Sequence, residues 1–159
     1  MKTIQLGQGC QARVDNKDYK RVKIYRWYAT YNPRTRSWYA MTWGQKKDRL
    51  YMHRLILNAP KTQQVDHRDH DTLNNCRENL RLATNSQNHM NGRKPRSGKT
   101  PYKGVYRVPN SQAHPWQARI TLNYKRINLG CWRTAKEAAL AYNKAAEIFF
   151  REFALPNQV

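Results

Sequence analysis

The sequence has few acidic residues, few cysteines and no long apolar run. Of its 159 residues only ten are Asp or Glu, and its three cysteines lie at positions 10, 76 and 131. Cysteines that are odd in number, far apart and outside any C-x-x-C pair argue against a disulfide framework and against a cysteine-rich zinc site. A secretory signal is also excluded, because Gly7 and Gly9 interrupt the start of the chain before an apolar segment can form. We therefore expect an intracellular protein with reduced cysteines.

Positive charge is what the sequence has in excess. Thirty Lys and Arg residues give a formal net charge of +20, and such a surface favours a polyanionic partner. An anionic membrane is the alternative to nucleic acid, but it would require a long apolar segment or one strongly amphipathic basic helix. The Lys and Arg residues are instead scattered through aromatic, strand-like sequence. We expect nucleic acid as the partner, with no membrane and no obligatory protein partner.

The pattern along the chain predicts an α+β protein of three modules. Residues 1–48 resemble short strands between turn formers and predict a small antiparallel sheet, whereas 49–57 fits a strand or a short helix equally well. Residues 49–91 contain the densest run of His, Asp and Asn, and residues 92–101 form a basic linker rich in Gly, Pro and Ser. Residues 102–159 predict three strands and then a helix.

That helix, expected from about position 134 to 151, is the clearest element in the sequence. Its apolar stripe is formed by Ala138, Tyr142, Ala145 and Phe149, and charged residues lie on the other side. We expect a three-stranded sheet packed on this one helix.

The central module predicts a strand, a loop, a second strand and a helix. The first strand ends at Asp66-His67 and the second covers Leu80 to Ala83. Thr84 and Gln87 have the spacing of a helix capping box, which places Asn88 in the first turns of the helix. Asp66 and Asn88 each offer a side-chain oxygen, and Mg²⁺ accepts one carboxylate and one amide oxygen while it keeps several waters.

His67 has a suitable ordinary pKa to take a proton from an attacking water. It follows Asp66 on the strand, so it reaches the same cleft only if the strand end is irregular.

These residues resemble the HNH endonuclease family, specifically the small phage- and intron-encoded enzymes with a D-H…N…N pattern. The resemblance covers about positions 53 to 91 and is carried by Asp66-His67, Asn74-Asn75, Glu78-Asn79-Leu80 and Asn88. It implies that His67 is the general base and that Asn79 braces the loop that orients it. It also implies that Asp66 and Asn88 hold one divalent metal ion, Mg²⁺ with Mn²⁺ as a substitute.

Three histidines near this pattern have open roles. Asn88 stands where the family name has His, and His89 is next to it, so the second metal ligand is Asn88 or its neighbour. His53 is a structural histidine or a phosphate contact, with the structural role favoured. His70 is expected to be an exposed loop residue.

The last module resembles the plant ethylene-response-factor type DNA-binding domain, also called the Apetala family. The resemblance covers about positions 102 to 157 and is carried by Gly104-Val105-Tyr106-Arg107, Trp116-Gln117-Ala118-Arg119-Ile120, Arg126-Ile127-Asn128-Leu129-Gly130 and Phe153-Ala154-Leu155-Pro156-Asn157. It implies a sheet whose open face enters the major groove. The base preference does not transfer, because Tyr106, Val108 and Thr121 replace arginines of the plant pattern.

Alternation along the strands separates a buried face of the sheet from an open one. Arg, Asn and Gln on an open face are suited to base edges, and basic linker residues are suited to phosphates. The candidate DNA contacts are Lys103, Tyr106, Gln117, Arg119, Thr121, Arg126 and Asn128 in the sheet module, and Arg93, Lys94 and Arg96 in the linker.

Together these features predict a site-specific, divalent-metal-dependent endonuclease of the homing type that acts on double-stranded DNA. With one site per chain it is expected to nick, or to cut both strands in two successive events, leaving 5′-phosphate and 3′-hydroxyl ends. The alternative is a transcription regulator that keeps an inactive nuclease fold as a docking module. The complete set of Asp66, His67 and Asn88 favours the enzyme, because a pure DNA-binding protein has no chemical need for it.

Overall fold

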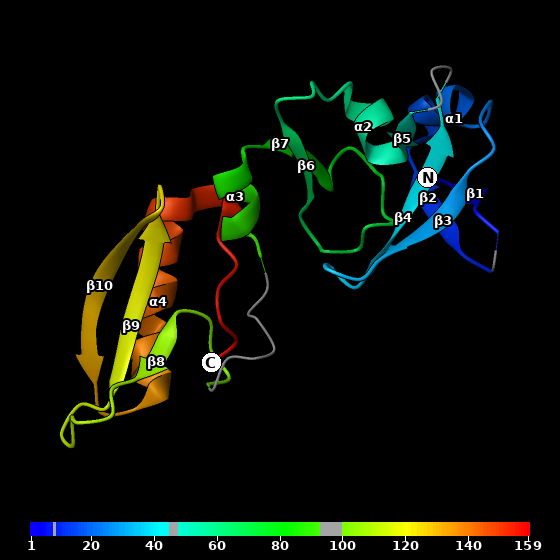
Figure 1. Ribbon diagram of the computed structural model, residues 1–159. Helices are drawn as coiled ribbons and strands as arrows, with labels where there is room; N and C mark the ends of the chain where they lie inside the picture. The colour runs from blue at the N-terminus through cyan, green and yellow to red at the C-terminus, as the bar shows by residue number, and fades with distance from the viewer. Residues whose placement is uncertain (8, 45–47, 93–99) are drawn as a thin grey trace. The chain divides into compact units, whose positions relative to one another are not determined.

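The computed structural model describes residues 1–7, 9–44, 48–92 and 100–159. The chain forms two compact units, Met1–Thr84 and Asn85–Val159, and each is described by itself. The units contain small antiparallel sheets and few helices (Figure 1), so the predicted α+β class is confirmed. No helix in the described part of the chain is long and apolar enough to cross a membrane.

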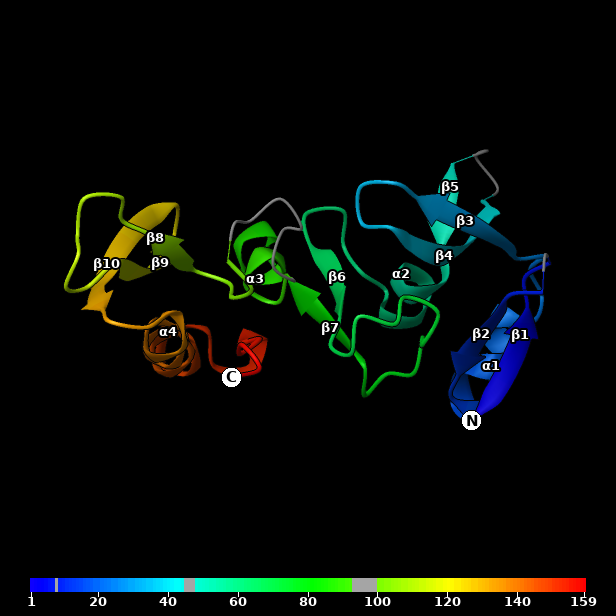
Figure 2. The ribbon, with the colours of Figure 1, turned by 90° about the horizontal axis from the view of Figure 1, so that it is seen from below.

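The first unit starts with two small sheets and two helices. Strands β1 (Lys2–Gln5) and β2 (Gln11–Val14) pair antiparallel and are followed by α1 (Asn16–Val22), which lies beside them in Figure 2. A three-stranded sheet follows, with β4 (Ser37–Trp43) between β3 (Tyr28–Asn32) and β5 (Arg49–Tyr51). Helix α2 (Met52–Leu57) comes directly after β5. The segment 49–57, for which the sequence fitted a strand or a short helix equally well, is thus strand β5 followed by helix α2.

The first unit ends with the predicted pair of central strands. Strands β6 (Gln64–His67) and β7 (Leu80–Ala83) pair antiparallel, and Asp66 lies opposite Arg81 while His67 lies opposite Leu80. The predicted helix is α3 (Asn85–Met90), which belongs to the second unit. The capping box at Thr84 stays a prediction.

One hydrophobic core joins these elements of the first unit. Its buried residues come from β2, α1, β4, α2, β7 and the connecting segments: Leu6, Ala12, Val14, Val22, Trp27, Ala40, Met52, Ile56 and Leu80. Trp27 also satisfies its indole nitrogen, which donates to the carbonyl of Val22 at 2.8 Å. Residues of the predicted N-terminal region, 1–48, and residues of the segment 49–91 therefore share one core. This shared core fixes the strand pair β6–β7 on the N-terminal sheets.

A partly buried ion pair ties α1 to the loop before β7. The Nε and Nη2 atoms of Arg77 donate to the two carboxylate oxygens of Asp18 at 2.7 and 2.8 Å, and Nη2 also donates to the carbonyl of Ile56 at 2.8 Å. The side chain of Asp18 is 5% exposed and that of Arg77 is 37% exposed. The hydrogen bonds to Asp18 raise the pKa of Arg77, so the guanidinium is charged throughout the working range.

We expect Asp18→Ala to lower the free energy of unfolding by on the order of 2 kcal/mol. Breaking a fully buried pair costs about 3–5 kcal/mol, and the partial exposure of Arg77 reduces that figure. Urea unfolding followed by circular dichroism measures the effect. The matched control is Asp71→Asn, because the Arg13–Asp71 pair is about half exposed on both sides and such pairs contribute about 0–1 kcal/mol. Equal destabilisation of the two variants would contradict this ranking.

The second unit packs a three-stranded sheet on one long helix. Strands β8 (Val105–Arg107), β9 (Trp116–Leu122) and β10 (Lys125–Trp132) form an antiparallel sheet with β9 in the middle. Helix α4 (Ala135–Phe150) lies along one face of this sheet (Figure 1) and leads into a short 3-10 turn, Arg151–Phe153. Thr134 caps α4 with a complete capping box to Glu137.

The packing face of α4 differs from the predicted stripe at its last position. Ala138, Tyr142 and Ala145 are buried as predicted, but Phe149 is 41% exposed and Phe150 is buried instead. The buried face also includes Ala139 and Ala146. Its centre therefore lies between the predicted stripe and the adjacent row of helix positions 139, 146 and 150. The prediction for Phe149 was therefore wrong.

A close approach between the sheet and α4 depends on Gly104. A Cβ atom at this position would lie 2.1 Å from the Tyr142 ring, and the φ angle of Gly104 is +75°. Asn157 closes the same end of the unit, since its side chain bonds both the backbone nitrogen and the carbonyl of Lys103.

Candidate active site

The active-site candidate is centred on His67, at the end of β6. Its side chain is buried among aromatic rings of the N-terminal sheet and α2. The imidazole ring of His53 lies 5.1 Å from that of His67, edge to face, and the Tyr39 ring lies at 6.3 Å. Tyr51 stacks on His53 at 5.5 Å. The β3–β4–β5 sheet and α2 therefore form the wall that holds the ring.

Burial lowers the pKa of His67 below its ordinary value of 6.5. The side chain of Asn75 opposes this effect by hydrogen bonding, and so do the carboxylates of Asp69, Asp66 and Asp71 through their charge. At neutral pH His67 is therefore an unprotonated imidazole, which is the form that accepts a proton.

His53 remains neutral at every working pH. Burial lowers its pKa to about 3, with further contributions from His67 and Arg54. Its Nδ1 atom is buried and has no hydrogen-bond partner among the described residues, and its ring packs edge to face against that of His67. This placement agrees with the structural role favoured from the sequence.

Asp66 forms a buried ion pair that the sequence did not predict. The Nη2 and Nε atoms of Arg81 lie 2.7 and 2.8 Å from Oδ2 of Asp66, and both side chains are 7% exposed. Arg81 reaches the carboxylate because the register of β6 and β7 places the two residues directly opposite each other. Only that register could have revealed the pair in advance.

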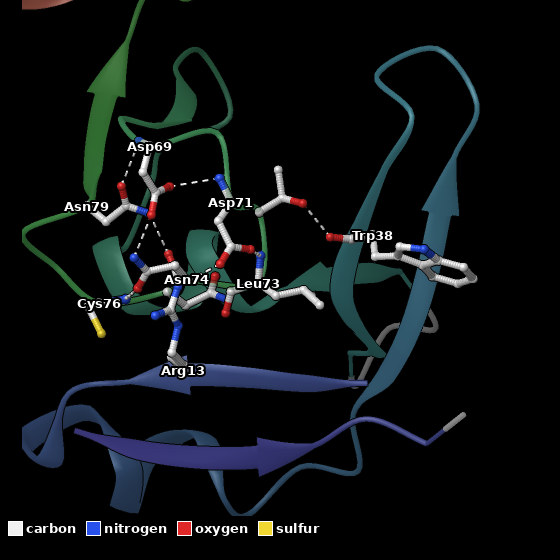
Figure 3. A network of polar contacts seen from close by, with 10 residues as sticks. Arg13, Trp38, Asp69, Asp71, Leu73, Asn74, Cys76 and Asn79 are labelled. Carbon is white, nitrogen blue, oxygen red and sulfur yellow. Dashed lines mark hydrogen bonds and ion pairs between the residues drawn. The ribbon is translucent and has the colours of Figure 1, made fainter. Parts of the chain in front are cut away.

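The loop between β6 and β7 is braced by Asn79 (Figure 3). The side-chain oxygen of Asn79 accepts from the backbone nitrogen of Asp69 at 3.0 Å, and its amide nitrogen donates to the carbonyl of Asn74 at 2.8 Å. Asp69 in turn accepts from the side chain of Asn74 at 2.7 Å and from the backbone nitrogen of Asp71 at 2.8 Å. These bonds connect both halves of the loop that follows His67.

The same loop is attached to the N-terminal sheets. Arg13 of β2 donates its backbone nitrogen to the carbonyl of Leu73, and its own carbonyl accepts from the backbone nitrogen of Asn75, both at 2.8 Å. Its guanidinium also lies 2.6 Å from Asp71. On the other side, the hydroxyl of Thr72 donates to the carbonyl of Trp38 in β4 at 2.5 Å (Figure 3). Sequence reasoning missed these supports because their partners are far apart along the chain.

The remaining predicted site residues lie in the second unit or outside the described residues. Asn88 and its neighbour His89 belong to α3. Cross-strand pairing of β8, β9 and β10 places the predicted sheet residues on one face, opposite the buried Ala118 and Ile120: Tyr106 with Gln117, Arg119 with Asn128, and Thr121 with Arg126. Arg93, Lys94 and Arg96 lie outside the described residues.

Some of these residues are engaged within the protein. Gln117 is buried and accepts from Nε of Arg119 at 2.5 Å, while the Arg119 guanidinium lies 5.3 Å from the centre of the Tyr106 ring. Lys103 donates its ammonium to the carbonyls of Met90 and Gly92 at 2.6 and 2.8 Å. Burial lowers the pKa of Lys103 to about 8. Its ammonium thus caps the C-terminal end of α3 and the residue Gly92 that follows it.

The residues around His67 are compatible with a magnesium ion that keeps most of its water. Among the described residues no group of three or more His, Cys, Asp or Glu side chains forms a full protein cage. Mg²⁺ does not require one, since one or two protein oxygens with waters and a substrate phosphate complete its shell. Asp66 supplies a buried carboxylate that Arg81 holds in place.

The HNH endonuclease family matches residues 51–90 of the chain. An uncharacterized HNH endonuclease from Acanthamoeba polyphaga mimivirus is 35% identical over 159 aligned positions, which cover 96% of this chain and 78% of the relative. No solved structure matches the chain. The matched segment contains His67, its braced loop and both central strands, and the similarity to the viral relative extends through almost the whole sequence. The protein therefore belongs to the HNH endonuclease family.

Proposed function

We propose that this endonuclease is site-specific and metal-dependent, and that it nicks double-stranded DNA to leave 5′-phosphate and 3′-hydroxyl ends. The observation that carries the proposal is the environment of His67. A neutral, buried imidazole follows a buried carboxylate, Asp66, at the end of a strand whose next loop is braced on both sides. The viral relative is consistent with an enzyme of mobile-element or homing type.

In this proposal His67 accepts the proton of the attacking water. Its lowered pKa keeps the imidazole neutral at pH 7, and a positioned base of this kind contributes about 10²–10⁴ to a rate. Asn79 acts on the loop and not on the substrate, because both ends of its amide are bonded to the loop backbone.

Asp66 and Asn88 are the proposed protein ligands of one divalent ion. When bound, Mg²⁺ supplies electrostatic stabilisation of the charge that develops on the phosphate and on the departing 3′ oxygen. The role of Arg81 is then to hold the carboxylate of Asp66 in one orientation through the buried ion pair.

The charge of Arg81 also bears on when metal binds. Arg81 balances the single negative charge of Asp66 inside the protein. The neutral ion pair alone therefore contributes little free energy to the binding of a divalent cation. A DNA phosphate would add the missing negative charge, and we therefore propose that metal and DNA bind together.

We predict that Arg81→Met strengthens metal binding in the absence of DNA by about tenfold, because Asp66 then has no internal counterion. Titration calorimetry with Mn²⁺ measures this directly. Thermal unfolding with and without Mn²⁺ separates metal binding from loss of the fold, because a folded variant should gain stability from the metal. Metal affinity that is unchanged or weaker in a folded Arg81→Met would contradict the charge argument.

Asp66→Ala and Asn88→Ala should each reduce metal-dependent cleavage, with Asp66 the more severe. Asp66 supplies the only formal negative charge of the pair. Because Asp66→Ala also leaves Arg81 buried without its partner, Asp66→Asn is the companion variant that keeps a hydrogen-bond acceptor. Cleavage rates over a Mg²⁺ titration are the measurement, and partial rescue at high Mg²⁺ is expected for Asn88→Ala. If His89→Ala lowered the cleavage rate and Asn88→Ala did not, the second metal ligand would be His89 and not Asn88.

We propose further that the second unit chooses the DNA site. The face of its sheet with Tyr106, Arg119, Thr121, Arg126 and Asn128 is opposite the face that packs on α4. Arginine and asparagine side chains on such a face can read guanine and adenine edges.

The experiment that tests the cleavage chemistry uses labelled duplex DNA with Mg²⁺, with and without chelator. The proposal expects cuts in one strand that chelator abolishes and that DNA ligase reseals, because ligase requires a 5′-phosphate and a 3′-hydroxyl. Cuts that resist chelator, or ends that ligase cannot join, would exclude this chemistry.

A further inference from the structure

One face of the β3–β4–β5 sheet begins beside His67 and continues to exposed aromatic rings. Residues directly opposite each other in a sheet share a face, and alternate residues of a strand share a face. Along β4, this places Tyr39, Met41 and Trp43 together. Their partners on β3 and β5 are Thr30 opposite Tyr39, Tyr28 and Tyr51 opposite Met41, and Arg49 opposite Trp43. We call these seven residues the outer face.

The inner end of the outer face is part of the wall around the catalytic histidine. The Tyr39 ring lies 6.3 Å from the ring of His67 and 6.2 Å from that of Tyr51, which stacks on His53. Tyr39 therefore belongs both to the outer face and to the wall around His67.

The far end of the outer face is aromatic, basic and accessible. Trp43 is 56% exposed and Tyr28 is 41% exposed. Arg49, opposite Trp43, is exposed, and the guanidinium of Arg26 lies 5.6 Å from the centre of the Tyr28 ring. None of the three strands contains an Asp or Glu. This end thus combines ring faces with cations.

Around Ala40 and Thr42, the opposite face of the same sheet packs inside the protein. Ala40 is buried in the core of the first unit, Ala29 and Leu50 pack against that core, and the hydroxyl of Thr42 donates to the carbonyl of Arg26. The exposed rings of Trp43 and Tyr28 are therefore not the uncovered edge of a core. They lie on the side of the sheet that faces away from it.

We propose that the outer face binds nucleobases that are unstacked from the duplex beside the cut, with Trp43 and Tyr28 as stacking surfaces and Arg26 and Arg49 on the backbone. The inference deepens the proposed function and rests on it. Intact duplex DNA exposes base edges and phosphates but not base faces. Large exposed aromatic rings therefore stack most favourably on bases that have left the duplex stack. Rings interleaved with arginines are typical of surfaces that bind single-stranded nucleic acid.

The spacing is compatible with a cut near the unstacked bases. Tyr39 and Trp43 are four residues apart on β4, which is about 13 Å at about 3.3 Å per residue. That length corresponds to about four nucleotides of stacked DNA, and to fewer when the strand is extended. The unstacked bases would thus lie within a few nucleotides of the phosphate at His67.

The test compares a fully paired duplex with a duplex of the same sequence that carries a three-base mismatched bubble. Full-length protein is titrated into each without divalent metal, so that binding is measured without cleavage, by fluorescence anisotropy. We expect tighter binding to the bubble. Trp43→Ala and Tyr28→Ala should each weaken bubble binding by about 5- to 150-fold, the range for removal of one base–aromatic stack, with little change on paired DNA.

The matched control is Trp38→Ala. Trp38 is 39% exposed on the same strand, but it lies on the opposite face, where its ring contacts Tyr31 at 5.2 Å. We expect this variant to bind the bubble within about twofold of the unmodified protein. Equal weakening by Trp38→Ala would show that the outer face is not the binding surface.

Other outcomes also overturn the proposal. Equal affinity of the unmodified protein for paired and bubble DNA would exclude unstacked bases as the ligand, and equal weakening of both DNAs by Trp43→Ala would make Trp43 a duplex contact. A change of oligomeric state in Trp43→Ala, seen by sedimentation, would make the face a self-association surface. Because no cleavage takes place in this assay, its failure is distinct from a failure of metal-dependent cutting.

Discussion

Replacing His67 by alanine is expected to lower the cleavage rate by about 10²- to 10⁴-fold and to leave DNA affinity within a few-fold. A general base acts on the water proton in the transition state and adds little to the binding of the ground state. The buried imidazole is neutral at pH 7 because burial lowers its pKa, so its loss removes the proton acceptor without removing a positive charge from the DNA surface.

Single-turnover cleavage and a gel shift on the same duplex measure the two quantities. His114→Ala is the control, since His114 is an exposed histidine of the second unit; it should cut at the normal rate. Circular dichroism establishes that His67→Ala is folded. A folded variant that still cuts at more than about a tenth of the original rate would show that another group is the base.

Deleting residues 98–159 should remove most of the site preference and leave residual nicking. The deletion takes away the proposed reading face and many cationic side chains, so affinity for the natural site falls. The salt dependence of binding should become shallower by about 0.9 units of log–log slope for each DNA phosphate that the shortened protein no longer neutralises. The first unit has its own core, with Trp27, Met52 and Ile56 among its buried residues, and should keep its fold.

The deletion also removes Lys103, which supports the end of α3. Lys103 donates to the carbonyls of Met90 and Gly92, so its removal should loosen α3 and with it Asn88. We therefore expect nicking by the truncated protein to be slower and to need more Mg²⁺. Cognate and scrambled duplexes compared at several salt concentrations provide the measurement, and full site preference in the truncated protein would contradict the role proposed for the second unit.

The full-length companion to the deletion is Arg126→Ala, which keeps Lys103 and its hydrogen bonds. If Arg126 reads a base, the variant should bind more weakly by about 1–3 kcal/mol, mainly on the cognate sequence. A phosphate contact would weaken all sequences alike.

Much of the fold follows from local patterns in the sequence. Strands with aromatic and β-branched residues between turn formers predicted β2, β3 and β4. The two short apolar runs, at Val65 and from Leu80 to Ala83, predicted the pair β6–β7. The long helix α4 is close to its predicted limits. Helix α1 was not predicted, because it has only seven residues and most of them are polar. Its buried residue Asp18 is paired with Arg77, which lies 59 positions away in the sequence.

The residues of the candidate site could be selected from the sequence, but the side chains that support them could not. Asp66, His67 and Asn79 could be selected from residue type and order. Arg81 became visible only through the register of two strands, and Arg13 only through its tertiary hydrogen bonds with the loop. Side chains that hold a site depend on three-dimensional contacts between distant segments, and a local pattern does not encode them.

The measurement that tests the central claim most directly is the conversion of supercoiled plasmid by the unmodified protein and by His67→Ala, prepared in parallel and compared at equal DNA occupancy in Mg²⁺. We predict that the unmodified protein produces nicked circles before linear DNA, that chelator stops the reaction, and that His67→Ala binds the plasmid without converting it. Absence of nicking by the unmodified protein in Mg²⁺ and in Mn²⁺, with DNA binding intact, would contradict the account and favour a DNA-binding regulator with a nuclease fold.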